Sequence, residues 1–132
     1  MSQIHLADET WIRAPLPRVA DAVADGLNWA RWFPALNLCL HQLRGPLGVR
    51  WWVAPSGRRR LAGSMEIWLE PSLDGVVLHY FLRLDPDDAR ALRPPERRRA
   101  ERAYVTTAKR GFFALKDELE SAGQPGRGSA PR

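Results

Sequence analysis

The segments on either side of the turn Ser72-Leu73-Asp74-Gly75 constrain the fold of this 132-residue chain more than any other part of it. Residues 61–70 and 76–84 are rich in β-branched, aromatic and leucine side chains, and both predict β-strands. With a loop of this length, Glu70 lies opposite Val77. In that register one face of the hairpin carries only apolar and aromatic side chains, namely Met65, Ile67, Leu69, Leu78, Tyr80 and Leu82. A slip of one residue would mix the two faces, so the pattern predicts this register and a sheet with one buried face.

Three further strands are expected before this hairpin, over residues 4–13, 36–44 and 49–54. If the strand at 49–54 pairs in the same register, Arg50 lies opposite Glu66 on the polar face. Its alternate side chains, Val49, Trp51 and Val53, then extend the apolar face. A sheet with one apolar face needs a second layer to cover it.

Two short helices are predicted between the first two strands. The first follows Pro17, which suits the first turn of a helix, and Gly26 is expected to end it. The second contains three large aromatic residues within residues 29–33. Asn28 is its expected N-cap, and Pro34 ends it because proline disfavours helical geometry at the residue before it.

A long amphipathic helix is expected to cover the apolar face of the sheet. Pro94 and Pro95 mark its start, and its apolar stripe at helical spacing consists of Tyr104, Val105, Ala108, Phe112, Leu115 and Leu119. Gly111 interrupts this helix at a cost of about 1 kcal/mol relative to alanine. Either a close approach of backbone or ligand requires a glycine here, or the position is simply unoptimised, and the sequence leaves both explanations open.

Several short motifs occur together in a characteristic order: Ala14-Pro15, Val19, Trp29, Trp32, Phe33, Pro34, and residues 66–71, 74–77 and 113–119. In this order they resemble the SRPBCC superfamily, the START-like helix-grip proteins, and most closely its polyketide cyclase/dehydrase branch. The resemblance implies an α+β helix-grip fold, in which an antiparallel curved sheet wraps around a long C-terminal helix and two short helices follow the first strand. Five strands are predicted here, whereas family members commonly have six or seven.

The resemblance also sets the expected domain organisation. It spans residues 4–120, so we expect a single START-like domain over residues 1–122. Residues 123–132 contain glycine, proline, serine and arginine without apolar anchors, and this composition predicts a disordered tail.

Proteins of this superfamily bind hydrophobic small molecules between the sheet and the C-terminal helix, and some catalyse cyclisation or dehydration. The resemblance therefore implies binding of a hydrophobic ligand, aromatic polyketide-like or lipidic, and leaves cyclase/dehydrase activity open. The candidate ligand-binding residues are Trp29, Trp32, Phe33, Trp51, Met65, Ile67, Tyr80, Leu82, Tyr104, Ala108, Gly111 and Phe112. Aromatic stripes more often form a core than a pocket, so the alternative is a non-catalytic structural or partner-binding domain with a packed interior.

Polar side chains alternate with the apolar ones on the central hairpin. In the predicted register Glu66, His79 and Arg83 face away from the helix. A register slipped by one residue would turn these three inward and make them the best catalytic set; catalytic residues are otherwise unknown. Trp52, Trp68 and Phe81 are expected beside His79 on the outer face, and exposed aromatic clusters often mark interfaces, so a homodimer through the sheet is a further hypothesis.

Charge and composition narrow the range of partners. The net charge is +5, and arginines are concentrated at residues 58–60 and within residues 97–110. No nucleic-acid-binding motif accompanies them, so a solvated basic surface is favoured over contact with RNA or an anionic membrane. No apolar run approaches the ~20 residues of a membrane span, and the N-terminus lacks a signal-peptide pattern, so we expect no membrane insertion and a cytoplasmic location.

No cofactor or metal is expected from the sequence. His5, His41 and His79 are scattered and have no nearby cysteine. Cys39 is the single cysteine, so it cannot form an internal disulfide. A base to activate it cannot be placed either, and we expect a small buried thiol rather than a nucleophile.

Overall fold

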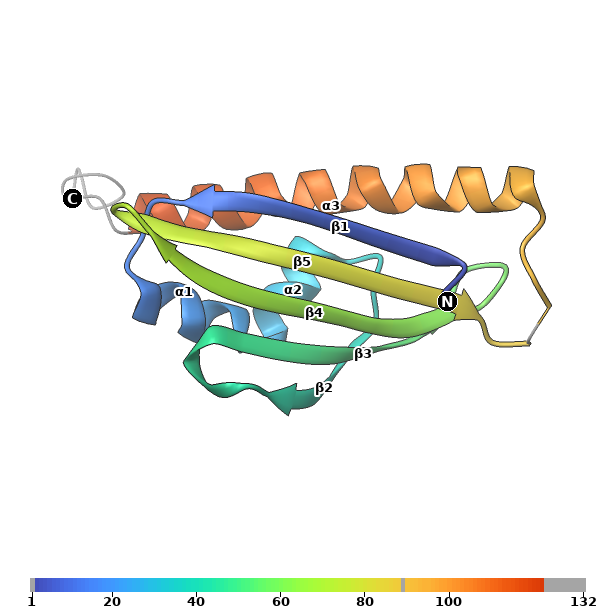
Figure 1. Cartoon of the computed structure of the whole chain (residues 1–132), viewed down its shortest axis with the longest axis horizontal. Coiled ribbons are helices and arrows are strands. Elements are labelled where there is room, and N and C mark those ends of the chain that lie inside the picture. The colour runs from blue at the N-terminus through green and yellow to red at the C-terminus, as the bar shows by residue number, and fades with distance from the viewer. Residues whose placement is uncertain (1, 89, 123–132) are drawn as a thin grey trace.

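The computed structural model describes residues 2–88 and 90–122, and the predicted disordered tail lies outside them. The elements in chain order are β1 (Ile4–Ile12), α1 (Leu16–Val23), α2 (Gly26–Trp32), β2 (Leu38–Leu43), a short 3-10 helix at Gly45–Leu47, β3 (Gly48–Ser56), β4 (Leu61–Ser72), β5 (Gly75–Pro86) and α3 (Pro94–Ala122). Figure 1 shows α3 running along the whole length of the sheet. The predicted α+β helix-grip architecture is confirmed.

The five strands form one antiparallel sheet in the order β1-β5-β4-β3-β2. The predicted register of the central hairpin is confirmed, since Ile67 pairs with Tyr80 and Met65 with Leu82. Arg50 pairs with Glu66, also as predicted. Burial alternates along β5 from Val76 to Leu84, which is the pattern of a sheet with one covered face.

The boundary between the two short helices differs from the prediction. Gly26 does not end α1; it is the first residue of α2, and Ala24 is the C-cap of α1. Asp25, not Asn28, caps α2, because its carboxylate accepts a hydrogen bond from the Leu27 amide at 2.9 Å. Sequence favours both residues as caps. With Asp25 as the N-cap, α2 begins three residues earlier than predicted and has 7 residues before its C-cap, Phe33.

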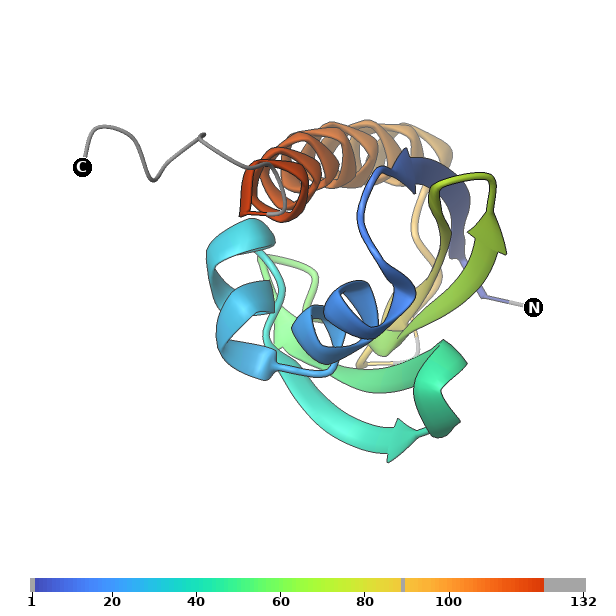
Figure 2. The same cartoon turned by 90° about the vertical axis from the view of Figure 1, so that its left-hand side faces the viewer.

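The core lies between the concave face of the sheet and the helices. Figure 2 shows the sheet curling around the interior, with α2 and α3 closing the side that the strands leave open. Leu115 and Leu119 of α3 are buried against it, as predicted, whereas Val105 is 43% exposed and lies outside the stripe. Val105 points about 100° around the helix axis from Tyr104, and this rotation takes its side chain away from the sheet.

The edge strand β2 is the least covered part of the sheet. Leu38 is half-buried, and Leu40 and Leu43 are both more than half exposed. Cys39 is exposed rather than buried, which corrects the expectation of a buried thiol. A strand at the edge of the sheet has a neighbour on one side only, and α3 packs against the opposite edge, β1.

Candidate functional site

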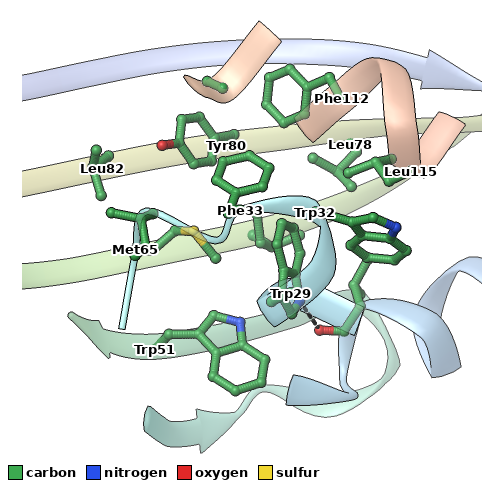
Figure 3. Packing of buried hydrophobic residues seen from close by; sticks show 14 of the residues in the cluster. Trp29, Trp32, Phe33, Trp51, Met65, Leu78, Tyr80, Leu82, Phe112 and Leu115 are labelled. Carbon is green, nitrogen blue, oxygen red and sulfur yellow. Dashed lines mark hydrogen bonds between the residues drawn. The ribbon is translucent and has the colours of Figure 1, made fainter. Parts of the chain in front are cut away.

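Apart from Tyr104, the predicted ligand-binding residues lie in the interior, where the aromatic ones around Phe33 pack tightly against one another. Eleven of the twelve are buried, and only Tyr104 is partly exposed. Phe33 lies within 5.2 to 5.8 Å of the rings of Trp29, Tyr80 and Phe112, measured between ring centroids. Figure 3 shows this arrangement, with the Phe33 ring between α3 and the central strands. Ligand contact by these residues stays a prediction; what the structure shows is an aromatic core.

Gly111 is explained by the position of Phe33. A Cβ atom at residue 111 would lie 2.1 Å from Cε1 of Phe33, far inside van der Waals contact. The glycine therefore gives α3 the close approach that the aromatic ring of Phe33 requires. The position does require a glycine, but the group that approaches is the side chain of Phe33, the C-cap residue of α2, rather than the backbone or ligand predicted from the sequence.

Burial also sets the chemistry of Tyr80. Its side chain is 1% exposed, and burial raises the pKa of the phenol well above its ordinary value. A phenol held in its neutral form cannot act as a general base near neutral pH. The ring of Tyr80 packs against those of Phe33 and Phe112, with centroids 5.7 and 5.2 Å away.

A hollow lies beside the first half of α3, away from Gly111 and Phe33. It is a groove of about 640 Å³ between the first half of α3 and the turn joining β3 to β4. Its lining is mostly small or apolar and includes three arginines: Ala35, Ser56, Gly57, Arg58, Arg59, Leu61, Leu92, Glu96, Arg99, Ala100, Ala103, Tyr104 and Thr107. Tyr104 is the one predicted site residue that lines it.

Local geometry places the β3–β4 turn over this groove. Gly57 has a φ of +77°, a backbone conformation that glycine adopts readily. It turns the chain so that Arg58 and Arg59 line the groove opposite α3. The hydroxyl of Tyr104 is hydrogen-bonded to Ser56 at the end of β3, and burial raises the pKa of this phenol too.

Arg59 is held inside the groove wall by acidic and backbone groups. Its guanidinium donates to the Glu96 carboxylate at 2.7 Å and to the backbone carbonyl of Arg90 at 2.9 Å. The Arg93 amide donates to the same carboxylate at 3.0 Å. This backbone hydrogen bond and the hydrogen bond from Arg59 lower the pKa of Glu96 below its usual range. Glu96 is therefore ionised at neutral pH and balances Arg59.

The polar set on the central hairpin lies on the opposite, convex face. His79 contacts Glu70 at 2.9 Å and Glu9 at 3.7 Å, away from α3. The observed register thus rules out the slipped arrangement in which Glu66, His79 and Arg83 would face the interior. Trp52 is half exposed there, and the ring of His41 lies 4.3 Å from it. A homodimer through this face stays a prediction.

Glu66 is the centre of a charged cluster on the convex face. It accepts hydrogen bonds from Arg50 at 2.7 Å and from the Trp68 indole at 2.7 Å. Burial by itself would raise the pKa of this carboxyl, but these two hydrogen bonds outweigh burial and keep the pKa below its usual range. Its partners and its position on the outer sheet assign Glu66 a structural role.

Residues 2–88 and 90–122 contain neither a cluster of metal ligands nor a membrane-spanning helix. No group of three or more histidine, cysteine, aspartate or glutamate residues in these segments could hold a metal ion. Within the same segments, no helix combines the length and apolarity needed to cross a membrane.

The groove residues were missed by sequence reasoning, although two signals for them exist. Ala100, Ala103 and Thr107 are small side chains at helical spacing, beside the start of the apolar stripe at Tyr104. The arginines at 58–60 follow Gly57 in a turn. Neither signal indicates a groove alone, because only the tertiary structure brings the turn and the helix together.

Comparison with known proteins supports the fold. No protein-family model matches the chain. No curated protein matches its sequence. Among solved structures, protein MLL2253 from Mesorhizobium loti is similar with a TM-score of 0.67 at 15% identity, over 88% of this chain and 96% of that one.

Two other solved structures carry more informative descriptions. The ZhuI aromatase/cyclase from Streptomyces sp. R1128 is similar with a TM-score of 0.54 at 20% identity, over 92% of this chain and 96% of that one. The Aha1 dimer from Colwellia psychrerythraea is similar with a TM-score of 0.56 at 11% identity, over 89% and 96% of the two chains. At these identities the likeness establishes a shared helix-grip fold, and it confirms the resemblance found in the sequence at that level.

Proposed function

We propose that this protein binds a hydrophobic small molecule, aromatic polyketide-like or lipidic, in the groove between α3 and the β3–β4 turn. The observation that carries the proposal is the apolar hollow of about 640 Å³ beside Leu61, Leu92 and Ala100. Binding sites for small molecules commonly measure ~300–1,000 Å³ and are lined mainly by apolar side chains with a few polar groups. The groove fits both criteria. A solved structure with the same fold is described as an aromatase/cyclase, which supports the choice of ligand class.

Cyclase or dehydrase activity is a finer proposal at the same groove. The observation that favours it is the position of Tyr104, a half-buried phenol in the groove lining that carries its proton at neutral pH. Such a group donates a hydrogen bond to a ligand carbonyl and stabilises negative charge that develops on its oxygen. Tyr104→Phe would then slow turnover of a bound polyketide while leaving the affinity for an apolar probe unchanged.

The alternative function is a structural or partner-binding domain with a packed interior. The aromatic contacts of Phe33, Tyr80 and Phe112 favour it for the end of the interior beneath Gly111. That alternative predicts no saturable binding of a hydrophobic compound anywhere in the molecule.

Titration with N-phenylnaphthylamine, a neutral probe that fluoresces in apolar sites, tests the proposal. We expect saturable binding to the natural protein and its loss in Ala100→Phe, which fills the groove from α3. Ala114→Phe is the matched control, since Ala114 is exposed on the same helix and does not line the groove. No binding to the natural protein, or equal binding by Ala100→Phe, would overturn the proposed function.

A further inference from the structure

We infer that the ligand of this groove is an amphipathic anion: a hydrophobic body with a carboxylate, sulfonate or phosphate group that Arg58 and Arg99 bind. The inference rests on the proposed function and specifies the chemistry of the ligand. It is carried by the contrast between the arginines that line the groove.

Three arginines line the groove, but only one of them is neutralised by the protein. Arg59 pairs with Glu96 at 2.7 Å and lies 3.9 Å from Asp88. Among the described residues, neither Arg58 nor Arg99 has an ion-pair or hydrogen-bond partner. Glu96 is the single acidic residue of the lining and is already engaged. The groove therefore carries uncompensated positive charge.

The two unpaired arginines come from different walls of the groove. Arg58 belongs to the β3–β4 turn, and Arg99 lies on α3 one turn after Glu96. Both side chains are exposed, so they keep their hydration when no ligand is bound. A guanidinium donates paired hydrogen bonds to a carboxylate, sulfonate or phosphate, and such charge-assisted bonds are about twice as strong as neutral ones. The two walls together can hold one anionic group at the rim.

The remaining lining defines the rest of the ligand. Leu61, Leu92, Ala100 and Ala103 form an apolar floor that holds no charged group. Arginines at the rim beside an apolar floor match a molecule whose charged headgroup stays at the rim while its apolar part is buried against the floor. A free polyanion without an apolar body would use the arginines and leave this floor exposed.

A pair of probes with the same apolar body tests the inference. Anilinonaphthalene sulfonate carries the same two aromatic units as N-phenylnaphthylamine and adds one negative charge. We expect the sulfonate to bind the natural protein about tenfold more tightly than the neutral probe, a difference of ~1.4 kcal/mol. Equal affinity of the two probes would overturn the inference and leave the proposed function intact. Absence of binding by both probes would overturn the proposed function itself.

Neighbouring arginines supply matched variants. We expect Arg99→Gln to weaken binding of the sulfonate several-fold and Arg58→Gln to have an effect of the same sign, with the neutral probe unaffected by either change. Arg98→Gln removes the same charge from the adjacent position, and Arg98 is exposed and does not line the groove. An equal loss in Arg98→Gln and Arg99→Gln would show that only net charge attracts the sulfonate and would overturn the assignment.

Competition without a dye completes the test. Laurate and dodecanol have the same alkyl chain and differ in the charge of the headgroup. We expect laurate to displace the bound sulfonate probe more effectively than dodecanol in the natural protein, and the difference to shrink in the Arg58→Gln, Arg99→Gln double variant. Displacement by inorganic phosphate alone at the same concentration as laurate would show that the apolar body is not recognised, and would count against an amphipathic ligand.

Discussion

The space between α3 and the sheet is filled at one end and open at the other. At the filled end, Gly111 and Ala108 face the Phe33 ring and its aromatic neighbours. At the open end, Ala100 and Ala103 are also small, but no aromatic side chain of α2 extends to them, and Ala35 lies there instead. Small residues on a helix thus have opposite consequences, because it is the facing element that decides whether they make a close contact or leave a groove.

The two ends also differ in charge. The filled end has Tyr80 as its buried ionisable group, and this phenol is neutral at ordinary pH. The open end has three arginines and one carboxylate. Substitutions at the filled end should therefore change the stability of the protein, and substitutions at the open end should change its affinity for ligands.

The largest effect on stability is expected from Phe33→Ala. Its ring is fully buried among Trp29, Tyr80 and Phe112, and the cavity left by its removal should lower the free energy of unfolding by about 3–5 kcal/mol. Urea denaturation followed by tryptophan fluorescence measures the change. Phe113→Ala is the control, because that phenylalanine is 74% exposed on the other side of the helix and should cost less than about 0.5 kcal/mol. Equal losses in the two variants would show that stability does not depend on the packing around Phe33.

Gly111→Ala should follow, with a loss of about 1–3 kcal/mol, because the added methyl group overlaps the Phe33 ring. The same substitution would otherwise stabilise a helix by about 1 kcal/mol. In a Phe33→Leu background the penalty should shrink by more than ~0.5 kcal/mol, measured as the coupling energy of a double-mutant cycle. Additive effects of the two substitutions would show that Phe33 is not the group that requires glycine.

Alkaline pH should distinguish the two tyrosines. A phenol with a raised pKa in the folded state contributes its full stability below the unfolded pKa of about 10. Above that pH the unfolded chain loses the proton first, so the free energy of unfolding should fall by up to ~1.4 kcal/mol per pH unit until the folded pKa is reached. Tyr80→Phe should flatten this decline more than Tyr104→Phe, because Tyr104 is less buried. Urea unfolding at several pH values above neutrality provides the measurement, and identical slopes in the two variants would contradict it.

The smallest effect on stability is expected from Arg99→Gln, less than about 0.5 kcal/mol. Arg99 is exposed and has no ion-pair partner among the described residues. The melting temperature should therefore stay close to that of the natural protein, although binding of an anionic probe decreases. A large loss of stability would mean that Arg99 supports the fold, so that the open end contributes to stability as the filled end does.

The fold could be predicted in considerable detail because its signals are local or pairwise. The hairpin register follows from the alternation of Met65 and Ile67 against Tyr80 and Leu82, and all of these pairings are observed. The site could not be predicted to the same degree. Except for Tyr104, the aromatic residues chosen as ligand contacts are buried in the core. The groove is formed by residues of four separate segments that have little apolar character individually.

The errors have the same physical origin as the successes. Val105 and Tyr104 both fit a broad apolar stripe, but Val105 lies at the margin of that stripe and its side chain is exposed. Cys39 and Leu40 alternate like a half-buried strand, yet their strand lies at the edge of the sheet and both side chains are exposed. Periodicity tells which residues share a face, and it does not tell whether a face is covered.

The sequence was sufficient to predict five strands along the chain, the pairing of the central hairpin and one covering helix. Alternation and helical spacing act over short distances along the chain, so these features can be recognised locally. The contact between Phe33 and Gly111, and the groove beside the first half of α3, arise only in the tertiary structure. Those outcomes depend on how far α2 and the β3–β4 turn extend in space, and no local pattern of residues encodes that distance.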